Sequence, residues 1–169
     1  MKQLNVFDVS GKALEAKDVH FWRLSVDGAS RNNPGLAGAG IVIAKDNNVV
    51  AEYGYFIGIK TNNQAEYLAL LLGLIQIKKC INPDDLLLIN SDSELMVKQI
   101  KGLYRVKNAD LRPLYNVICS LLNTIQYDIG HVLRDKNVEA DALANKGIDN
   151  KIRVPEEVLK VLHENDISL

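Results

Sequence analysis

The chain has 169 residues, of which 47% are hydrophobic and 24% charged, the composition of one globular domain with a sizeable core. The formal net charge of -1 excludes a protein that binds nucleic acid through overall basicity, so any contact with a polyanion must be local. The first residues lack the apolar core of a signal peptide. The sequence also contains no run of about 18 or more apolar residues, the length needed to span a membrane. We therefore expect a soluble, cytoplasmic protein without a membrane partner.

Three segments are expected along the chain. Residues 1–20 have weak periodicity and form an N-terminal extension, residues 21–149 form the domain, and residues 150–169 form a tail with a short amphipathic helix after Pro155. The two cysteines, Cys80 and Cys119, each follow an apolar helical pattern. This placement favours buried free thiols over a disulfide.

The first half of the domain indicates three strands that follow one another. Residues 21–26 alternate like a strand, and residues 27–35 (DGASRNNPG) have the glycine, asparagine and proline of a turn. Residues 38–44 and 49–58 are strand-like and flank the turn-forming stretch KDNN. The pattern predicts an antiparallel hairpin there.

The second half alternates helices with strands. Residues 61–64 are cap-type residues before a helix whose apolar positions make it heavily buried. Residues 86–89 are a continuous apolar run, typical of a central strand covered on both faces. Residues 91–94 have the form of a capping box for the next helix, and a further helix covers residues 111–122. Residues 127–133 predict the last strand, and Asn137 is expected to cap a final helix of the domain.

This order predicts an α/β fold in which a five-stranded mixed sheet, three antiparallel strands and then parallel ones, has helices on both faces. Four acidic residues stand at the ends of these elements. Asp27 and Asp92 follow apolar strands, whereas Glu66 and Asp141 lie in the first turns of helices. Because open sheets commonly place their sites at the carboxyl ends of strands, we expect these carboxylates to converge.

Four carboxylates held together would repel one another, and divalent cations relieve that repulsion. Mg²⁺ prefers oxygen ligands and commonly binds through a few carboxylates and the phosphate oxygens of a substrate. Two such ions can activate a water molecule and stabilise the leaving oxygen. The acidic segments therefore predict hydrolysis of a phosphodiester.

Four segments match the motifs of a known family, in the same order and on the same helices and strands. They are DGASRNNPG from Asp27, TNNQAE from Thr61, SDS from Ser91 and NVEADALA from Asn137. On these motifs the chain resembles a type 1 ribonuclease H from about Trp22 to Ile148. The resemblance implies a ribonuclease H-like fold and endonucleolytic cleavage of the RNA strand of an RNA·DNA hybrid, leaving 5′-phosphate and 3′-hydroxyl ends. It also implies two Mg²⁺ ions per site, with Mn²⁺ as the alternative metal.

The resemblance assigns a separate task to each acid. Asp27 would bridge the two metal ions, Glu66 and Asp92 would complete the ion nearer the leaving group, and Asp141 would hold the ion that carries the attacking water. Taken singly, Asp27 could be an ordinary turn residue and Asp141 could favour a helix N-terminus. The joint occurrence of all four favours the catalytic interpretation.

Two residues compete for a further catalytic role. In the familiar bacterial pattern a loop histidine precedes the last aspartate by ten residues, and His131 has that spacing, although the sequence around it resembles a strand. Shorter-loop members carry an arginine in that role, which Arg134 matches. We favour Arg134, whose guanidinium would act on phosphate because it stays charged at neutral pH and cannot transfer protons.

Contacts with the hybrid are implied at a further set of positions. Amides and backbone groups there would reach the minor groove, where 2′-hydroxyls distinguish RNA from DNA, or grip a DNA phosphate. The residues concerned are Asn33, Thr61, Asn62, Asn63 and Ser93. Turn and cap chemistry accounts equally well for the asparagines and the threonine. Glu94 departs from the glutamine of the familiar bacterial enzymes and is equally a capping acid.

The familiar enzymes also insert a basic, tryptophan-bearing helix for hybrid binding, and this chain has only residues 102–108 at that place. Lys98, Arg105 and Lys107, together with Lys101 and Arg112, remain as a modest basic cluster that could meet the DNA backbone or be an ordinary solvated face. The absence of the insertion predicts weaker, more salt-sensitive binding.

Two alternatives to a hybrid-specific nuclease remain at this stage. A short-loop relative could also, or mainly, cut double-stranded RNA, and a chain that had lost catalysis could serve as a hybrid-binding module. The presence of all four acids argues against the second alternative. We expect a monomer.

Overall fold

The computed structural model describes residues 18–169, so nearly all of the expected N-terminal extension lies outside the described residues. No helix within residues 18–169 is long and apolar enough to cross a bilayer. The elements in chain order are β1 (Phe21–Asn32), β2 (Gly35–Lys45), β3 (Asn48–Lys60), α1 (Asn62–Ile77), β4 (Leu86–Ser91), α2 (Glu94–Ile100), α3 (Arg112–Leu122), β5 (Gln126–His131), the short 3₁₀ helix η1 (Arg134–Lys136), α4 (Val138–Asp149) and α5 (Glu156–Glu164).

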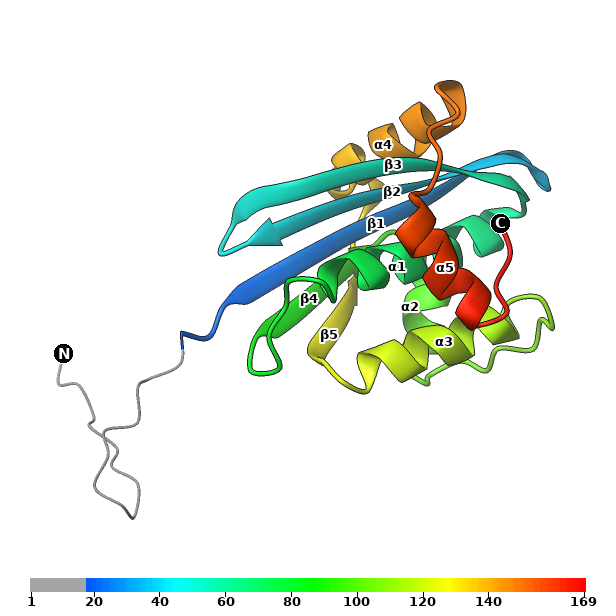
Figure 1. Ribbon diagram of the computed structural model, residues 1–169. Coiled ribbons are helices and arrows are strands. Elements are labelled where there is room, and N and C mark those ends of the chain that lie inside the picture. Colours follow the sequence, from blue (N-terminus) through cyan, green and yellow to red (C-terminus); the bar gives the residue numbers. More distant parts are fainter. Residues whose placement is uncertain (1–17) are drawn as a thin grey trace, which may run out of the picture.

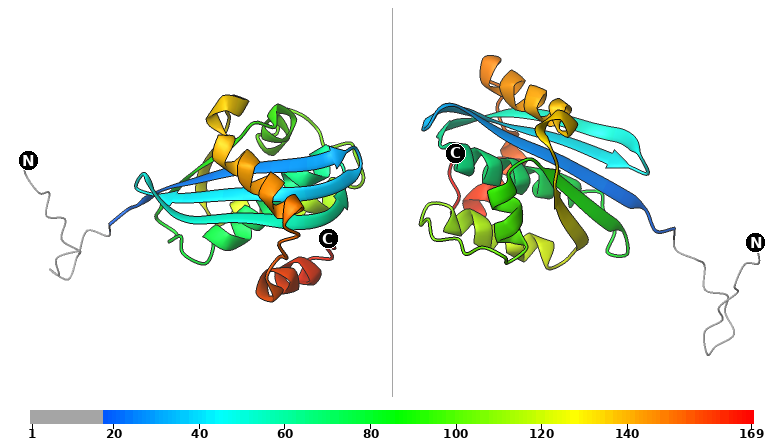
Figure 2. Two further views of the ribbon diagram at one scale, coloured as in Figure 1. Left: turned by 90° about the horizontal axis from the view of Figure 1, so that it is seen from above. Right: turned by 180° about the vertical axis from the view of Figure 1, so that it is seen from behind.

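The five strands form one sheet in the order β3-β2-β1-β4-β5. The pairs β1–β2 and β2–β3 are antiparallel, whereas β1–β4 and β4–β5 are parallel. Helix α4 crosses one face of the sheet, and α1, α3 and α5 lie on the other, with α2 beside α1 (Figures 1 and 2). The predicted fold class, a five-stranded mixed sheet with helices on both faces, is confirmed.

The first strand is longer than its sequence predicts. Residues 27–32, which we expected to form a turn, continue β1, and their register pairs Asp27 with Gly40 and Asn32 with Gly35. Only Asn33 and Pro34 remain between β1 and β2, and the peptide bond that joins them is cis. The prediction was wrong because glycine and asparagine favour turns locally, whereas β2 offers backbone partners along the whole segment.

The predicted hairpin between β2 and β3 is confirmed. Asp46 and Asn47, its two turn residues, both have positive φ, 48° and 68°. Type I′ turns require positive φ at both central residues, and Asn and Asp tolerate it better than other non-glycine residues. Their backbone twist matches that of the flanking strands, so this turn fixes the register of β2 against β3.

Helix α1 fills the centre of the molecule, as its apolar sequence predicts. Its start is a capping box, in which Thr61 Oγ1 accepts a hydrogen bond from the Gln64 backbone and Gln64 Oε1 accepts one from the Thr61 backbone. Every residue from Tyr67 to Ile77 is buried. The polar side chain of Gln76, which this burial would otherwise leave unpaired, donates to the Tyr55 hydroxyl at 3.0 Å.

Two expectations about burial are wrong, one for β4 and one for the cysteines. We expected residues 86–89 to be covered on both faces, but Leu88 is 41% exposed. The reason is the position of α4, which packs over β1, β2 and β3 and leaves that face of β4 open. The cysteines are free, as expected, but Cys80 is exposed and Cys119 only half-buried. Cys80 lies beyond the end of α1, where the helical pattern no longer determines burial.

Two expected helix caps are also corrected. Glu94 is the first residue of α2 rather than its third, so residues 91–94 form no capping box, and the carboxylate instead pairs with Lys98 at 2.7 Å. Asn137 precedes α4, but its side chain makes no cap hydrogen bond. Its Nδ2 instead donates to the buried Val26 carbonyl oxygen of β1, which holds the side chain where its Oδ1 accepts no bond from the helix N–H groups.

The tail packs on the domain on the side away from α4. Ile152 accepts a hydrogen bond at its carbonyl oxygen from the Phe56 backbone of β3 at 2.7 Å. The short helix expected after Pro155 is present as α5, and Val158 and Leu162 bury its apolar side in the core beside α1. The tail therefore does not cover the hollow that Asp27, Glu66, Asp92 and Asp141 line.

Candidate active site

Strand register brings Asp27 and Asp92 together. The parallel pairing of β1 with β4 ends at Val26 opposite Ser91, and the next residue in each case is an aspartate: Asp27 within β1 and Asp92 just beyond β4. Beyond this pair β1 continues against β2 alone, so Asp27 lies within its strand rather than at its end as expected. Both carboxylates lie where β1 and the chain after β4 separate, and Asp27 is only 4% exposed there.

Glu66 reaches the same place from α1 through a close contact of helix and strand. It lies in the second turn of α1, one turn later than predicted, and its Oε2 accepts a hydrogen bond from the Gly28 backbone at 3.1 Å. A Cβ atom on Gly28 would stand 2.2 Å from the Ala65 carbonyl carbon and the Glu66 nitrogen. Glycine is therefore required at position 28, because any side chain would force α1 away from β1.

The three carboxylates form a compact cluster. One oxygen from each of Asp27, Glu66 and Asp92 lies within 4.8 Å of the others. Hard divalent cations bind such oxygen sets, often with water and substrate oxygens completing the coordination. The residues fit a divalent metal ion because they supply only anionic oxygen ligands and remain partly accessible to a substrate.

The electrostatics of the cluster give the same indication. Burial, followed by the negative charges of Asp92 and Asp141, raises the pKa of Asp27 to about 7. Burial also raises the pKa of Glu66 well above its usual range, with Asp27 and Asp92 adding to the effect and the Gly28 backbone N–H opposing it. The positive charge of Arg134 lowers both pKa values but does not offset burial and the neighbouring carboxylates.

Asp141 completes the acidic edge from α4. It lines the same hollow as the three clustered carboxylates, although it is not part of their compact set. The Nη2 atom of Arg134 donates to Asp141 Oδ1 at 3.1 Å, and Arg134 is otherwise well exposed. The structure thus brings all four predicted acids, and Arg134, to one hollow between β1, α1 and α4.

Asn137, which the sequence predicted to cap a helix, instead connects β1 to Asp92 and to the start of α4. Its Nδ2 donates to the Val26 carbonyl oxygen at 2.9 Å and lies 3.4 Å from Asp92 Oδ1. The residue is 2% exposed, and its Oδ1 atom has no hydrogen-bond partner among the described residues. Asn137 is therefore placed to orient Asp92 and to fix the start of α4 against β1.

His131 does not share the hollow. It ends β5 in register with Ser91 and is exposed. Its strand β5 lies against α2, and Lys98, followed by His131, lowers the pKa of Glu94 at the start of that helix. Of the two residues that competed for the further catalytic role, Arg134 is the one beside Asp141.

Some of the polar residues expected to bind substrate form hydrogen bonds within the protein, whereas others are open to solvent. Thr61 is engaged in the α1 capping box, and Asn33 accepts a hydrogen bond from the Asn62 backbone at 3.0 Å. The side chain of Asn62 lines the acidic hollow, and Asn63 is exposed. The turn and cap chemistry is thus real for Thr61 and Asn33, while Asn62 and Asn63 keep side chains open to a ligand.

The expected contacts on and after α2 differ from one another. Ser93 is half-buried and donates its backbone N–H to Ser91 Oγ at 3.1 Å. Lys98 is neutralised by Glu94 and lies over the Tyr104 ring, 5.1 Å from its centroid. The remaining cations in this region, which include Arg105 and Lys107, are exposed. Residues 101–111, between α2 and α3, contain no helix.

Two residues of the hollow were missed by the sequence analysis. Arg31 and Asn145 line it together with the acids. Their signal was present as spacing: Arg31 is four residues after Asp27 on a strand, and Asn145 is four residues after Asp141 on a helix. Both spacings return a side chain to the same face of its element.

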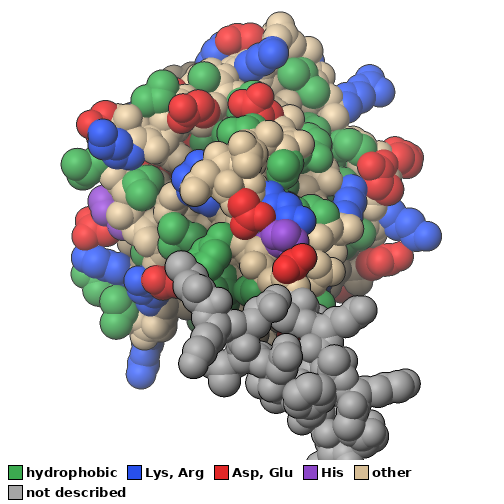
Figure 3. Space-filling view, turned by 90° about the vertical axis from the view of Figure 1, so that its left-hand side faces the viewer, with side chains coloured by type: hydrophobic (Ala, Val, Ile, Leu, Met, Phe, Trp, Pro, Cys, Tyr) green, Lys and Arg blue, Asp and Glu red, His purple; other side chains and the backbone are tan. Residues whose placement is uncertain are grey.

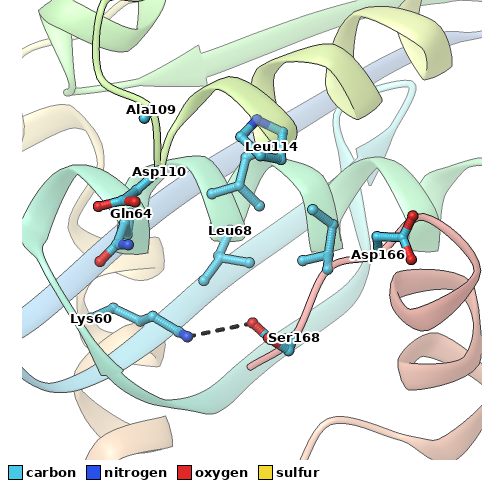
Figure 4. A pocket seen from close by; sticks show the side chains of 10 residues that line it. Lys60, Gln64, Leu68, Ala109, Asp110, Leu114, Asp166 and Ser168 are labelled. Carbon is cyan, nitrogen blue, oxygen red and sulfur yellow. Dashed lines mark hydrogen bonds between the residues drawn. The ribbon is translucent and has the colours of Figure 1, made fainter.

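A second hollow, which none of the four predicted acids lines, lies between the start of α1, the start of α3 and the C-terminal residues (Figure 4). Lys60 Nζ approaches the Ser168 carbonyl oxygen at 3.4 Å across its mouth. Ile167 is buried there, so the C-terminal residues themselves cover the start of α1. None of the four predicted acids, and neither Arg31 nor Arg134, lines this second hollow.

The comparisons with known proteins identify the class first. Residues 25–147 match the model of the reverse transcriptase-like family. The ribonuclease HI of Halobacterium salinarum is 42% identical over 126 residues, which are 73% of this chain and 62% of that protein. A bifunctional protein of Mycobacterium tuberculosis is 40% identical over 131 residues, 75% of this chain and 35% of its own length. The chain thus spans less than two thirds of these curated relatives.

Solved structures give the particular family. The ribonuclease H1 of Halobacterium salinarum has a TM-score of 0.73 at 38% identity and matches over 77% of this chain and 98% of its own. A ribonuclease H1 isolated from compost and solved in complex with RNA/DNA hybrid has a TM-score of 0.71 at 34% identity, over 76% of this chain and 97% of its own. The chain belongs to the type 1 ribonuclease H family.

Proposed function

We propose that this protein is an endoribonuclease that hydrolyses the RNA strand of RNA·DNA hybrids and leaves 5′-phosphate and 3′-hydroxyl ends. The observation that carries the proposal is the convergence of Asp27, Glu66 and Asp92 within 4.8 Å of one another beside Asp141. Membership of the ribonuclease H family supports the reaction, and the hybrid bound to the related compost enzyme supports the substrate.

Two Mg²⁺ ions, or Mn²⁺ ions, held by these acids would activate a water molecule and stabilise the leaving oxygen. Asp27, which is 4% exposed and whose pKa is raised by both Asp92 and Asp141, would hold metal together with Glu66, Asp92 and Asp141. The Gly28 N–H orients Glu66, and the Asn137 amide orients Asp92. These two ligands are thus held by neighbours before substrate binds, which lowers the entropy lost on binding.

Arg134 would act on phosphate. In the free protein it holds Asp141, and its exposed guanidinium can reach toward a bound strand. A guanidinium stays protonated at neutral pH, so the task of Arg134 is to position and neutralise charge and not to transfer protons.

Binding of the duplex has to be local. The formal net charge is -1, and the end of the molecule that carries the β2–β3 hairpin mixes acidic, basic and apolar side chains (Figure 3). The expected contacts are Asn33, Asn62 and Asn63 beside the acids, and Arg105 and Lys107 beyond α2. We propose that hybrid binding is weak because few cations contribute to it. Its salt slope should be shallow, and not steep as the missing insertion led us to expect, because each phosphate contact adds to the slope.

The test is cleavage of end-labelled hybrid, duplex RNA and duplex DNA with Mg²⁺, with Mn²⁺ or with EDTA, repeated with Asp92→Asn. We expect the hybrid alone to be cut, only with a divalent ion, and the variant to lose at least about 100-fold in rate because a metal ligand is removed. Glu139→Gln, an exposed acid on the first turn of α4, is the matched control and should cut like the wild type. Survival of the hybrid under every condition would refute the proposal, and preferential cutting of duplex RNA would replace its substrate.

A further inference from the structure

Arg31 stands beside the acidic hollow without any role in the metal cluster. It lines the hollow with Asp27 and Asn62, and it lies four residues after Asp27 on β1, a distance of about 13 Å along the strand. Side chains two and four residues apart on a strand point to the same face. The Arg31 side chain therefore leaves the sheet on the same side as the Asp27 carboxylate.

The present partner of Arg31 is an exposed carboxylate. Its Nη2 contacts Asp149 Oδ1 at 2.6 Å, and the two side chains are 49% and 54% exposed. The contact joins one guanidinium nitrogen to one carboxylate oxygen, and the other guanidinium N–H groups have no acceptor among residues 18–169. Exposed ion pairs of this kind contribute little to stability and exchange readily for a better acceptor.

The pair repeats, at the other end of α4, the arrangement of Arg134 with Asp141. Both aspartates belong to α4 and are eight residues apart, which is about 12 Å along the helix. Two arginines are thus held by carboxylates of α4, and both line the hollow that contains Asp27. Planar guanidinium groups bind phosphate through two parallel hydrogen bonds, which a carboxylate contact on one nitrogen does not use.

We propose that Arg31 binds a backbone phosphate of the RNA strand, on the side of the acid cluster away from Arg134, by exchanging Asp149 for the phosphate. Asp149 then acts as a competing anion that holds the guanidinium in place in the free protein and must be released when the strand binds. The inference rests on the proposed function, because the acids identify the hollow as the place that receives the strand to be cut.

Opposite charge changes at the two residues test the exchange. Arg31→Ala should raise KM for hybrid roughly ten-fold with little change in kcat, and should reduce the slope of log KM against log salt by about one, the loss of one phosphate contact. Asp149→Asn should instead lower KM roughly two- to five-fold, because the competing anion is removed. Arg31→Lys, which keeps the charge without the fork, should fall between the wild type and Arg31→Ala.

Matched controls come from the far side of the sheet. Glu157 of α5 forms an exposed pair with Lys79 at 3.7 Å, and α5 lies on the face opposite α4 (Figures 1 and 2). Glu157→Gln makes the same charge change as Asp149→Asn and should leave KM unchanged. An equal fall in KM for both variants would show a general charge effect and overturn the exchange.

Binding without cleavage identifies the strand. In an Asp92→Asn background, fluorescence anisotropy measures the affinity for hybrids that each carry one neutral methylphosphonate linkage. At one position of the RNA strand, this neutral linkage should weaken binding so that Arg31→Ala causes no further loss of affinity. A DNA-strand position with that property, or no position at all, would overturn the assignment. If the wild type cuts hybrid but Arg31→Ala changes neither KM nor the salt slope, only this inference fails; if the wild type cuts no hybrid, the proposed function itself fails.

Discussion

The Nδ2 atom of Asn137 donates a hydrogen bond to the carbonyl oxygen of Val26 at 2.9 Å, although the two residues are 111 positions apart in the chain. Val26 precedes Asp27, and Asn137 precedes the helix that carries Asp141. The same Nδ2 atom lies 3.4 Å from Asp92 Oδ1. One buried amide therefore connects the strand and the helix of the acidic hollow and contacts one of its acids.

Removal of this amide should loosen the site as well as the fold. Asn137→Ala leaves the Val26 carbonyl oxygen buried without its donor, so we expect the free energy of unfolding to fall by about 1–3 kcal/mol. Urea denaturation measures this loss, and a Mn²⁺ titration followed by thermal shift should show weaker metal binding. Asn165→Ala removes a similar side-chain bond, 2.8 Å to the Val161 carbonyl oxygen, at an exposed place and is the control. Equal effects of the two variants on metal binding would contradict a positioning role.

The stability of the metal-free protein should depend on Asp27 and pH. The pKa of this carboxyl is raised from 3.8 to about 7 in the fold, so between these values the folded state binds more protons than the unfolded state. The contribution of protonated Asp27 to stability is complete below about pH 4 and is lost as the pH rises through about 7. Relative to Asp27→Asn, the wild type should therefore lose a few kcal/mol across this range.

Thermal unfolding of both proteins in EDTA, from pH 4 to pH 8, measures the difference. Asp27→Asn should melt at a higher temperature than the wild type at pH 8, and the two should converge at pH 4. Mg²⁺ should raise the melting temperature of the wild type more than that of the variant, because a ligand that binds only the folded state stabilises it. A difference that stays constant with pH would be inconsistent with a raised pKa at Asp27.

The contact of α4 with β2 should be intolerant of a single methyl group. A Cβ atom on Gly40 would stand 1.8 Å from the Ala140 carbonyl oxygen, so Gly40→Ala must displace the helix turn that carries Asp141. We expect a loss of about 1–3 kcal/mol in stability and a lower kcat. Gly130→Ala is the control, since its nearest neighbour would be Asn90 Oδ1 at 3.9 Å. If Gly40→Ala retained full activity, the position of α4 would not matter to the reaction.

Arg134 and His131 should differ in their effect on kcat. Arg134 holds Asp141 at the hollow, whereas His131 lies beside the start of α2. Arg134→Ala should reduce kcat on hybrid by roughly 10- to 100-fold, as expected when a reacting group is misplaced, while His131→Ala should change it little. Single-turnover cleavage separates this effect from product release. A larger loss for His131→Ala would restore the histidine to the role that its spacing suggested.

Local sequence patterns predicted the elements better than they predicted the burial and length of those elements. The periodicity of α1 and the Asp46-Asn47 turn are local properties, so both were predicted correctly. The length of β1 was not, because glycine and asparagine in residues 27–32 favour a turn until β2 pairs with them. Leu88 was taken as buried because an apolar run does not reveal which strands α4 covers.

The sequence by itself determined the chemistry of this protein: the four acids in their motifs, the order of strands and helices around them, and the arginine that follows the last strand. Only the tertiary structure decided which of these residues meet. Asp27 and Asp92 are neighbours because β1 and β4 pair in one register, and Arg31 and Arg134 flank them because α4 supplies an aspartate near each of its ends. Residue types fix the possible reactions, whereas register and packing between distant segments fix the distances on which any reaction depends.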